Sequence, residues 1–249
     1  MKSILIKLKF IINNIFWLVL KFPEFKLLFN RLSFYDIKLF KFLDWTSHTF
    51  YFKANLEEKN IFIKLFKHEN KNIREAEVLK YISNSESGAL APKLIYESPI
   101  KNKFIIVTEI IEGGILKEKN IDFDFFLLIA DQFIEILNSL QKLDVVHCDI
   151  RPNNIIITPS KKVKLIDFEF AICKSIQNLN NLNFENKLIL QNLGEEYSCE
   201  GFIWDDAYSF YRIIKNILEF NEYRESDLYI ANEKVDIIKS YIGINTYEI

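Results

Sequence analysis

The chain has 249 residues, a formal net charge of −2 at pH 7 and 49% hydrophobic residues. This length suffices for one two-lobed domain or two small ones, and the nearly neutral charge gives no sign of bulk electrostatic binding to nucleic acid. The three cysteines form neither a CxxC pair nor an even disulfide framework, which favours a reducing cytosol. With only three histidines, the sequence offers few candidates for a zinc site or a Ser-His-Asp triad.

Residues 1–32 are predicted to form an amphipathic helix with a wide apolar face. Apolar residues recur at helical spacing, at Ile4, Leu8, Ile11, Ile15, Val19 and Phe22. The longest uncharged run, Phe10–Leu20, contains two Asn and is too short and polar to span a bilayer. Either the helix lies in a membrane interface, helped by lysines and Trp17, or it packs on the globular domain. Because the apolar stripe continues through Phe25 and Phe29, we favour the membrane interface.

Three strands are predicted next, at Lys38–Trp45, Thr49–Asn55 and Asn60–Phe66. The third strand carries Lys64 among apolar residues, and a buried lysine needs an anionic partner. The helix beginning at Ile73 supplies two candidate partners, Glu75 and Glu77. The alternative is an edge strand with a snorkelling lysine beside a solvated, charged helix.

The remaining elements follow from apolar patterning. We predict strands at Ala91–Glu97 and Lys103–Gly114, a long helix at Phe123–Leu143, an irregular Asn-rich stretch over 171–203, a helix opening at Trp204-Asp205-Asp206, and a last helix at Ala231–Tyr241.

One segment, residues 145–170, concentrates the polar residues that could carry chemistry. Two apolar runs, 155–157 and 163–166, flank a Pro-Ser-Lys-Lys turn and predict a β-hairpin. Since a hairpin brings its ends together, Asn154 at its start and Asp167 at its end should be neighbours. Two oxygen ligands beside the carboxylate of Asp149 suit Mg²⁺, which is usually held by few protein oxygens plus substrate phosphates. The alternative is an Asx-rich turn between two core strands.

This segment resembles the protein-kinase superfamily. His147-Cys148-Asp149-Ile150-Arg151-Pro152-Asn153-Asn154 looks like its catalytic loop H-R-D-L-x-x-x-N, and Asp167-Phe168-Glu169 looks like its D-F-G triplet with one residue altered. Lys64 is similar to the lysine of V-A-I-K, and Asp206-Ala-Tyr-Ser-Phe resembles an element whose Asp braces the catalytic loop. Motif resemblance covers roughly residues 40–215.

The resemblance implies an α+β, two-lobed protein-kinase-like fold. The N-lobe would be an antiparallel sheet with one helix, and the C-lobe would be reduced and mainly helical. The implied divisions are an N-terminal helical segment at 1–32, an N-lobe at 33–112 and a C-lobe at 113–249.

The resemblance also implies roles for individual residues, with ATP and Mg²⁺ as cofactors. Asp149 would orient the attacking hydroxyl or accept its proton, and Arg151 would face the γ-phosphate or pair with a structural carboxylate. The nucleotide would be bound by Lys64 held by Glu75, by Thr108 as gatekeeper, and by the backbone of Glu109 and Ile111, while Asn154 and Asp167 would hold the metal.

Several departures from the superfamily pattern bear on the acceptor. The first glycine is Gly88, so there is no glycine-rich loop, and no A-P-E triplet follows. Phe62 replaces a small residue that packs on adenine, and Cys148 replaces an arginine that reads a phosphorylated activation loop. These features, with an E-x-x-E-G hinge at Glu109–Gly113, look most like small bacterial kinases of lipopolysaccharide core heptose.

We therefore expect an ATP- and Mg²⁺-dependent phosphotransferase acting on a sugar hydroxyl of a membrane-bound glycolipid such as lipopolysaccharide core. It would be cytoplasmic, or peripheral on the inner face of the bacterial cytoplasmic membrane through residues 1–32, with no nucleic-acid partner. One alternative is a protein Ser/Thr kinase. Another is a pseudokinase serving as a binding module, which the presence of Lys64, Asp149, Asn154 and Asp167 disfavours.

Overall fold

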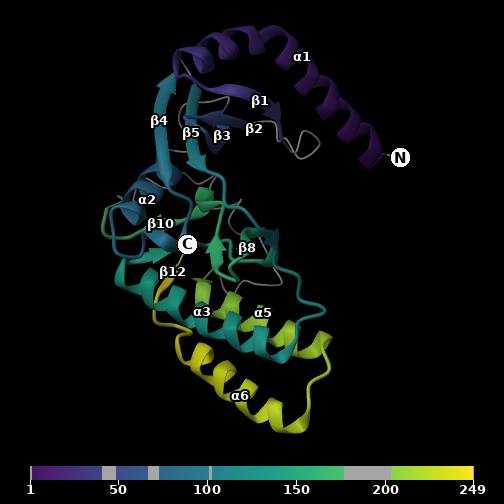
Figure 1. The fold of residues 1–249 in the computed structure, drawn as a ribbon, viewed down its shortest axis with the longest axis vertical. Helices are drawn as coiled ribbons and strands as arrows, with labels where there is room; N and C mark the ends of the chain where they lie inside the picture. Colours follow the sequence, from purple (N-terminus) through teal and green to yellow (C-terminus); the bar gives the residue numbers. More distant parts are fainter. Residues whose placement is uncertain (1, 41–48, 67–72, 101–102, 177–202, 249) are drawn as a thin grey trace. The chain divides into compact units, whose positions relative to one another are not determined.

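The computed structural model describes residues 2–40, 49–66, 73–100, 103–176 and 203–248. The chain divides into two compact units (Figure 1). The first comprises Met1–Ala76 and Lys93–Ile110, and the second comprises Glu77–Pro92 and Ile111–Ile249.

The first unit contains an antiparallel sheet of five strands in the order β1-β2-β3-β5-β4. Its strands are β1 Tyr35–Leu39, β2 Thr49–Leu56, β3 Lys59–Phe66, β4 Leu94–Ile100 and β5 Lys103–Glu109. Hairpin β2–β3 turns at Glu57 and Glu58, which both have positive φ, of 47° and 64°. This is the backbone that the common two-residue hairpin turn requires, here supplied by two glutamates instead of glycine.

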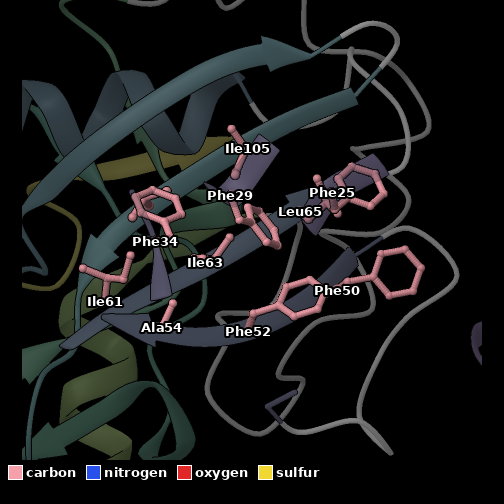
Figure 2. Packing of buried hydrophobic residues seen from close by; sticks show 11 residues of the cluster. Phe25, Phe29, Phe34, Phe50, Phe52, Ala54, Ile61, Ile63, Leu65 and Ile105 are labelled. Carbon is pink, nitrogen blue, oxygen red and sulfur yellow. The ribbon is translucent and has the colours of Figure 1, made fainter. Parts of the chain in front are cut away.

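The long helix α1, Lys2–Arg31, packs on one face of this sheet through its C-terminal half. Phe25 and Phe29 are buried against alternate residues of the strands, such as Ile61, Ile63 and Leu65 of β3 (Figure 2). The ring of Phe29 meets that of Phe52 edge-on at 5.7 Å between centroids. Because side chains alternate between the two faces of a strand, Phe62, Lys64 and Phe66 of β3 belong to the opposite face.

The structure bears on two predictions for the N-terminal region, the placement of the first helix and the bounds of the first strand. The alternative in which the first helix packs on the domain holds for its C-terminal half, because Phe25 and Phe29 belong to the core of the sheet. The predicted first strand, Lys38–Trp45, overlaps β1 at Lys38 and Leu39, but β1 begins three residues earlier, at Tyr35, and the part of the prediction from residue 41 lies outside the described residues. Phe34 is buried in the same core, so pairing with β2 starts directly after the helix, at Tyr35. The predicted hairpin tip at 45–49 lies mostly outside the described residues.

Helix α2, Ile73–Ser83, begins in the first unit and continues into the second. The second unit is mainly helical, with α3 Phe123–Lys142, α5 Asp206–Phe220 and α6 Glu225–Ser240. Helix α6 begins six residues before the predicted Ala231 because its first turn is polar; Glu225 and Asp227 there suit the positive end of the helix dipole. The apolar face of α3 contacts α5, where the rings of Phe133 and Phe210 lie 4.1 Å apart.

Short strands complete the second unit. They are β6 Gly114–Ile115, β7 Val145–Val146, β8 Ile155–Ile157, β9 Val163–Leu165, β10 Ile172–Cys173, β11 Ile203–Asp205 and β12 Thr246–Glu248. Strands β8 and β9 form the predicted hairpin, with Ile155 opposite Leu165. Single turns of 3-10 helix lie at Gly88–Leu90, Pro152–Asn154 and Phe168–Phe170. No helix in the described part of the chain is long and apolar enough to cross a lipid bilayer.

Candidate active site

Lys64 and Glu75 form a buried ion pair in the first unit. The Lys64 Nζ lies 2.7 Å from the Glu75 Oε1, and both side chains are almost fully shielded from solvent. The predicted partner, Glu75, is therefore confirmed over the fallback Glu77. Two buried charges at this distance make a short, charge-assisted hydrogen bond that offsets part of their desolvation cost. A lysine held in this way presents a fixed positive charge on its face of the sheet.

The three residues predicted to contact adenine lie where β5 ends. Thr108 is buried opposite Phe62 of β3, while the Glu109 side chain accepts a hydrogen bond from the Lys93 N–H at 3.1 Å. Ile111 comes two residues after the end of β5 and belongs to the second unit, which resumes at this residue. The roles of Thr108, Glu109 and Ile111 in nucleotide binding stay predictions.

Phe62, which the sequence marks as a departure near the predicted adenine position, packs among other aromatic side chains. Its ring stacks on Tyr51 at 5.8 Å between centroids and meets Phe40 edge-on at 5.8 Å. The phenyl ring is thus held by neighbours within its own sheet. A nucleotide base placed there would meet a fixed aromatic surface in place of a small aliphatic side chain.

In the second unit, Asp149 is the centre of a polar cluster formed by its own loop. Its Oδ2 accepts a hydrogen bond from the Asn154 Nδ2 at 2.6 Å and pairs with the Arg151 Nη2 at 3.1 Å. The same Asn154 amide also donates to the Asp149 backbone carbonyl at 2.9 Å. Of the two alternatives for Arg151, pairing with a carboxylate is therefore observed, and the carboxylate is Asp149 itself. Asp149 is buried, so these contacts fix the direction of its carboxylate.

Burial raises the pKa of the Asp149 carboxyl to about 6, against the attraction of the Arg151 guanidinium, and the nearby Asp167 carboxylate adds to the rise. A carboxyl with a pKa near 6 is ionised at neutral pH yet is a stronger proton acceptor than an ordinary aspartate. General-base catalysis is most effective when the pKa of the base lies close to the working pH. The burial of Asp149 and its raised pKa suit a general base, and its catalytic role stays a prediction.

Asp206 braces the backbone of the same loop, as the resemblance implies. Its Oδ2 accepts the His147 N–H at 2.6 Å and its Oδ1 accepts the Cys148 N–H at 3.2 Å. Cys148 has a φ of 63°, which a residue with a side chain rarely adopts, so the loop needs such an anchor. Burial raises the pKa of Asp206 to about 7, although the two backbone hydrogen bonds lower it in part.

His147 joins the loop to the far end of the hairpin. Its Nε2 lies 3.1 Å from the Ile166 carbonyl oxygen, and its ring lies 4.5 Å from that of Phe168. Because Ile166 and Phe168 flank Asp167, the imidazole links the position of this carboxylate to that of the loop. Asp167 itself has a φ of 66°, a left-handed conformation that aspartate tolerates better than most residues.

The hairpin brings together the two residues predicted to hold a metal. The Ile166 N–H donates to the Asn154 carbonyl oxygen at 2.9 Å, so Asn154 and Asp167 lie at adjacent ends of β8 and β9. Both hydrogen bonds from the Asn154 side chain to Asp149 use its amide nitrogen, not its amide oxygen. Amide and carboxylate oxygens are ligands that Mg²⁺ prefers. Within the described ranges, no group of three or more His, Cys, Asp or Glu side chains is arranged to hold a metal ion. The metal-binding roles of Asn154 and Asp167 stay predictions; an amide oxygen and a carboxylate would hold a metal ion together with phosphate oxygens.

Sequence reasoning missed two supports of this loop. Asp205 caps α5, accepting the Ala207 N–H at 2.9 Å, and its other oxygen accepts the Gly243 N–H at 2.7 Å. Asn245 donates to the Val145 carbonyl at 2.7 Å, directly before the loop. The Asp-Asp pair at the start of a helix was a usable signal for the cap. Nothing local in the sequence identifies the partners at 243 and 245, which lie far along the chain.

Comparison with known proteins agrees with this geometry. Residues 49–186 match a family model described as "Protein kinase domain". The chain is 22% identical over 198 residues to a probable serine/threonine-protein kinase, mkcD, of Dictyostelium discoideum, covering 76% of this chain and 30% of that protein. It is 27% identical over 155 residues to the serine/threonine-protein kinase PEPKR2 of Arabidopsis thaliana, covering 59% of this chain and 32% of that protein. The chain thus spans about a third of the length of these relatives.

Among solved structures, the fold is similar to the kinase PK-1 of Cydia pomonella granulovirus. The TM-score is 0.54 at 17% identity, with 84% of this chain and 78% of that chain covered. The predicted α+β, kinase-like fold is therefore confirmed. Both the Dictyostelium and the Arabidopsis relative are named serine/threonine-protein kinases, and these comparisons give no support for the heptose-kinase branch that the departures in sequence favoured.

Proposed function

The chain belongs to the protein kinase family, and from this premise we propose that it transfers the γ-phosphate of ATP to a serine or threonine hydroxyl of a protein. The observation that carries the proposal is the buried Asp149 carboxylate, held by Asn154 and Arg151 on a loop braced by Asp206. The names of the relatives support a protein acceptor. Cytoplasmic localisation is part of this proposal, as in the expectation from the sequence.

In the proposed reaction, the acceptor hydroxyl gives its proton to an Asp149 oxygen as its own oxygen bonds to the γ-phosphorus. The bond from that phosphorus to the bridging oxygen breaks, and ADP leaves. Lys64, fixed by Glu75, would bind the α- and β-phosphates. Asn154 and Asp167 would hold the Mg²⁺, which supplies positive charge to the phosphates. The fixed groups of the chain therefore position the reactants and accept the proton, which is most of what phosphoryl transfer requires.

A second candidate acceptor is a sugar hydroxyl of a membrane-bound glycolipid. Cys148 favours it, because this residue occupies the place of the arginine that would read a phosphorylated activation loop. Its side chain is buried with Sγ 3.6 Å from the Val146 carbonyl oxygen. The absence of a glycine before Gly88 and of an A-P-E triplet points in the same direction. The chemistry of Asp149 would be the same for either hydroxyl.

The test is turnover of γ-labelled ATP with protein and glycolipid acceptors, for the wild type and two variants. Asp149→Asn keeps an oxygen to accept the Asn154 amide but removes the basic carboxylate. We expect kcat to fall on the order of 10²–10⁴-fold with little change in the KM for ATP, because the base acts mainly in the transition state. Lys64→Met should raise the KM for ATP as well, because a phosphate contact is lost in both ground and transition states.

Asp144→Asn is the matched control, since Asp144 precedes the same loop, is half exposed, and has a φ of 55° that asparagine also adopts readily. This variant should behave as the wild type. Label found in phosphoserine or phosphothreonine would support the proposal, whereas label confined to glycolipid would favour the second candidate. A wild-type protein that binds no nucleotide would overturn both and identify a binding module.

A further inference from the structure

Helix α1 carries two sets of apolar residues, and the sheet covers one of them. Its buried or half-buried positions, Phe22, Phe25, Leu28 and Phe29, fall on the face that enters the core. A second set of large apolar residues is exposed, at Ile12, Ile15, Phe16, Val19, Leu20 and Leu27. Phe16 is 65% exposed and Val19 is 70% exposed. An amphipathic helix that served only the core would carry polar residues on its outer side.

The exposed set is concentrated between Ile12 and Leu20. Ile12, Ile15, Phe16 and Val19 follow the three- and four-residue spacing that places side chains on one side of an α-helix, and exposed Leu27 lies two turns further on the same side. This side is roughly opposite the one that carries Phe25 and Phe29. Each residue advances the direction of its side chain by about 100° around the helix axis, so positions two apart, such as Phe25 and Leu27, point in nearly opposite directions. In Figure 1 the N-terminal turns of α1 extend beyond the strands, whereas its other end leads into β1.

Charge indicates what covers the exposed face. Helix α1 contains six basic residues and one acidic residue, a net charge of +5 in a chain whose total is −2. The first acidic residue of the whole sequence is Glu24. Lys26 and Arg31 are exposed. A helix that combines an outward apolar stripe with an excess of lysine suits the boundary between anionic headgroups and acyl chains.

We propose that the exposed face of α1, defined by Ile12, Ile15, Phe16, Val19, Leu20 and Leu27, binds the surface of an anionic lipid bilayer while the opposite face remains in the sheet core. The helix therefore fastens the sheet of the first unit directly to the membrane, without a linker. Since Phe25 and Phe29 are structural, this contact is tested by changing the exposed face, not by removing the helix. Lipid binding by this face is independent of which acceptor receives the phosphate.

The experiment is flotation of the full chain with vesicles of phosphatidylcholine alone and with vesicles that also contain phosphatidylglycerol. We expect binding to the anionic vesicles that weakens as salt screens the basic residues. The double variant Phe16→Glu with Val19→Glu should reduce binding at least about tenfold, because two apolar side chains leave the acyl boundary and two negative charges replace them. Its melting temperature should stay close to that of the wild type, since both positions are exposed.

Tyr229→Glu is the matched control, because Tyr229 of α6 is 71% exposed and lies in the second unit. This variant should bind vesicles as the wild type does. Equal binding by the double variant, or no binding of the wild type to anionic vesicles, would overturn the proposal. A wild-type dimer that the double variant converts to a monomer, without vesicle binding in either protein, would also overturn it and assign the face to a second copy of the chain.

Discussion

The sheet of the first unit and the catalytic loop of the second are stabilised by different forces. The sheet is held on one face by aromatic and aliphatic packing, with Phe29 of α1 surrounded by Phe34, Phe52 and their neighbours. The loop is held by directional hydrogen bonds to buried carboxylates: two backbone N–H groups donate to Asp206, and the Asn154 amide donates to Asp149. The first arrangement tolerates exchange among residues of similar volume, whereas the second requires particular atoms at particular places.

This difference explains where the chain departs from the family pattern. Strand β3 carries Lys64, which pairs with Glu75 of α2, while the strands of the sheet lack glycine and include Phe62. The loop retains Asp149, Asn154 and Asp167 and varies at Cys148, which uses only its backbone N–H toward Asp206. Three perturbations should separate the two kinds of stabilisation.

The largest effect is expected in the aromatic core. Phe29→Ala should lower the free energy of unfolding by about 3–5 kcal/mol, because it deletes a fully buried ring and leaves a cavity. Denaturant unfolding measures the change. The control Phe16→Ala, on the exposed face of the same helix, should change it by less than about 0.5 kcal/mol. Deletion of residues 1–32 should for the same reason give an insoluble or unfolded chain; a folded remainder would show that α1 is dispensable to the sheet.

A smaller and pH-dependent effect is expected at Asp206. Asp206→Asn leaves one backbone N–H facing an amide NH₂ in place of an acceptor, which should cost on the order of 1–3 kcal/mol. The folded-state pKa of Asp206 is raised from 3.8 to about 7. Its protonation therefore contributes stability that is fully present below pH 3.8 and is lost as pH rises through about 7.

The penalty of Asp206→Asn should consequently be larger at acidic pH than at alkaline pH, measured by denaturant unfolding in the two buffers. The penalty of Phe29→Ala should be the same in both, since no titrating group is removed. Equal pH dependence of the two variants would contradict the distinction between a polar and an apolar scaffold.

The smallest effect is expected at Arg151. Its guanidinium lowers the pKa of Asp149, so Arg151→Gln should raise that pKa above its value of about 6. The acidic limb of the kcat/KM profile should then move to higher pH, and only modestly because Arg151 is partly exposed and its charge is partly screened by solvent. The profile of kcat/KM against pH measures the shift. Arg224→Gln is the control, because it removes an ion pair with Asp227 at the start of α6 and should leave the acidic limb in place. If the acidic limb does not move in Arg151→Gln, Asp149 is not the base whose ionisation determines it.

Sequence alone identified the parts of the fold whose partners are close in the chain. The hairpin β8–β9 and the loop before it lie within about twenty residues, and the polar residues there have few alternative uses. Lys64 and Glu75 are eleven positions apart; a buried lysine needs a carboxylate, and the family resemblance favoured Glu75 over Glu77. Asp206 was identified as a brace only through the family resemblance, since it bonds residues 58 and 59 positions away.

The face of α1 that enters the core was not predictable in this way. Phe16 and Phe29 have the same hydrophobicity, and a helix that is apolar on both sides gives no periodic signal for which arc is buried. The outcome depends on a sheet whose strands come later in the sequence. The pairing of Arg151 with Asp149 was likewise left open, because charge alone did not decide between a phosphate and a carboxylate. The start of β1 at Tyr35 followed from the burial of Phe34, which its local sequence does not indicate.

The packing of α1 against β5 also has a consequence for biosynthesis. Strand β5 lies inside the sheet, between β3 and β4, and contributes Ile105 and Val107 to the core that receives Phe29. At translation rates of about 5–20 residues per second, these residues are made on the order of 5–20 s after the helix begins. Throughout that interval Phe25 and Phe29 lack the completed sheet that buries them, and the second apolar set of α1 is exposed as well. We therefore expect the nascent chain to be bound by chaperones or lipid until β5 has left the ribosome, so that the last-made strand of the core determines when its first-made helix becomes native.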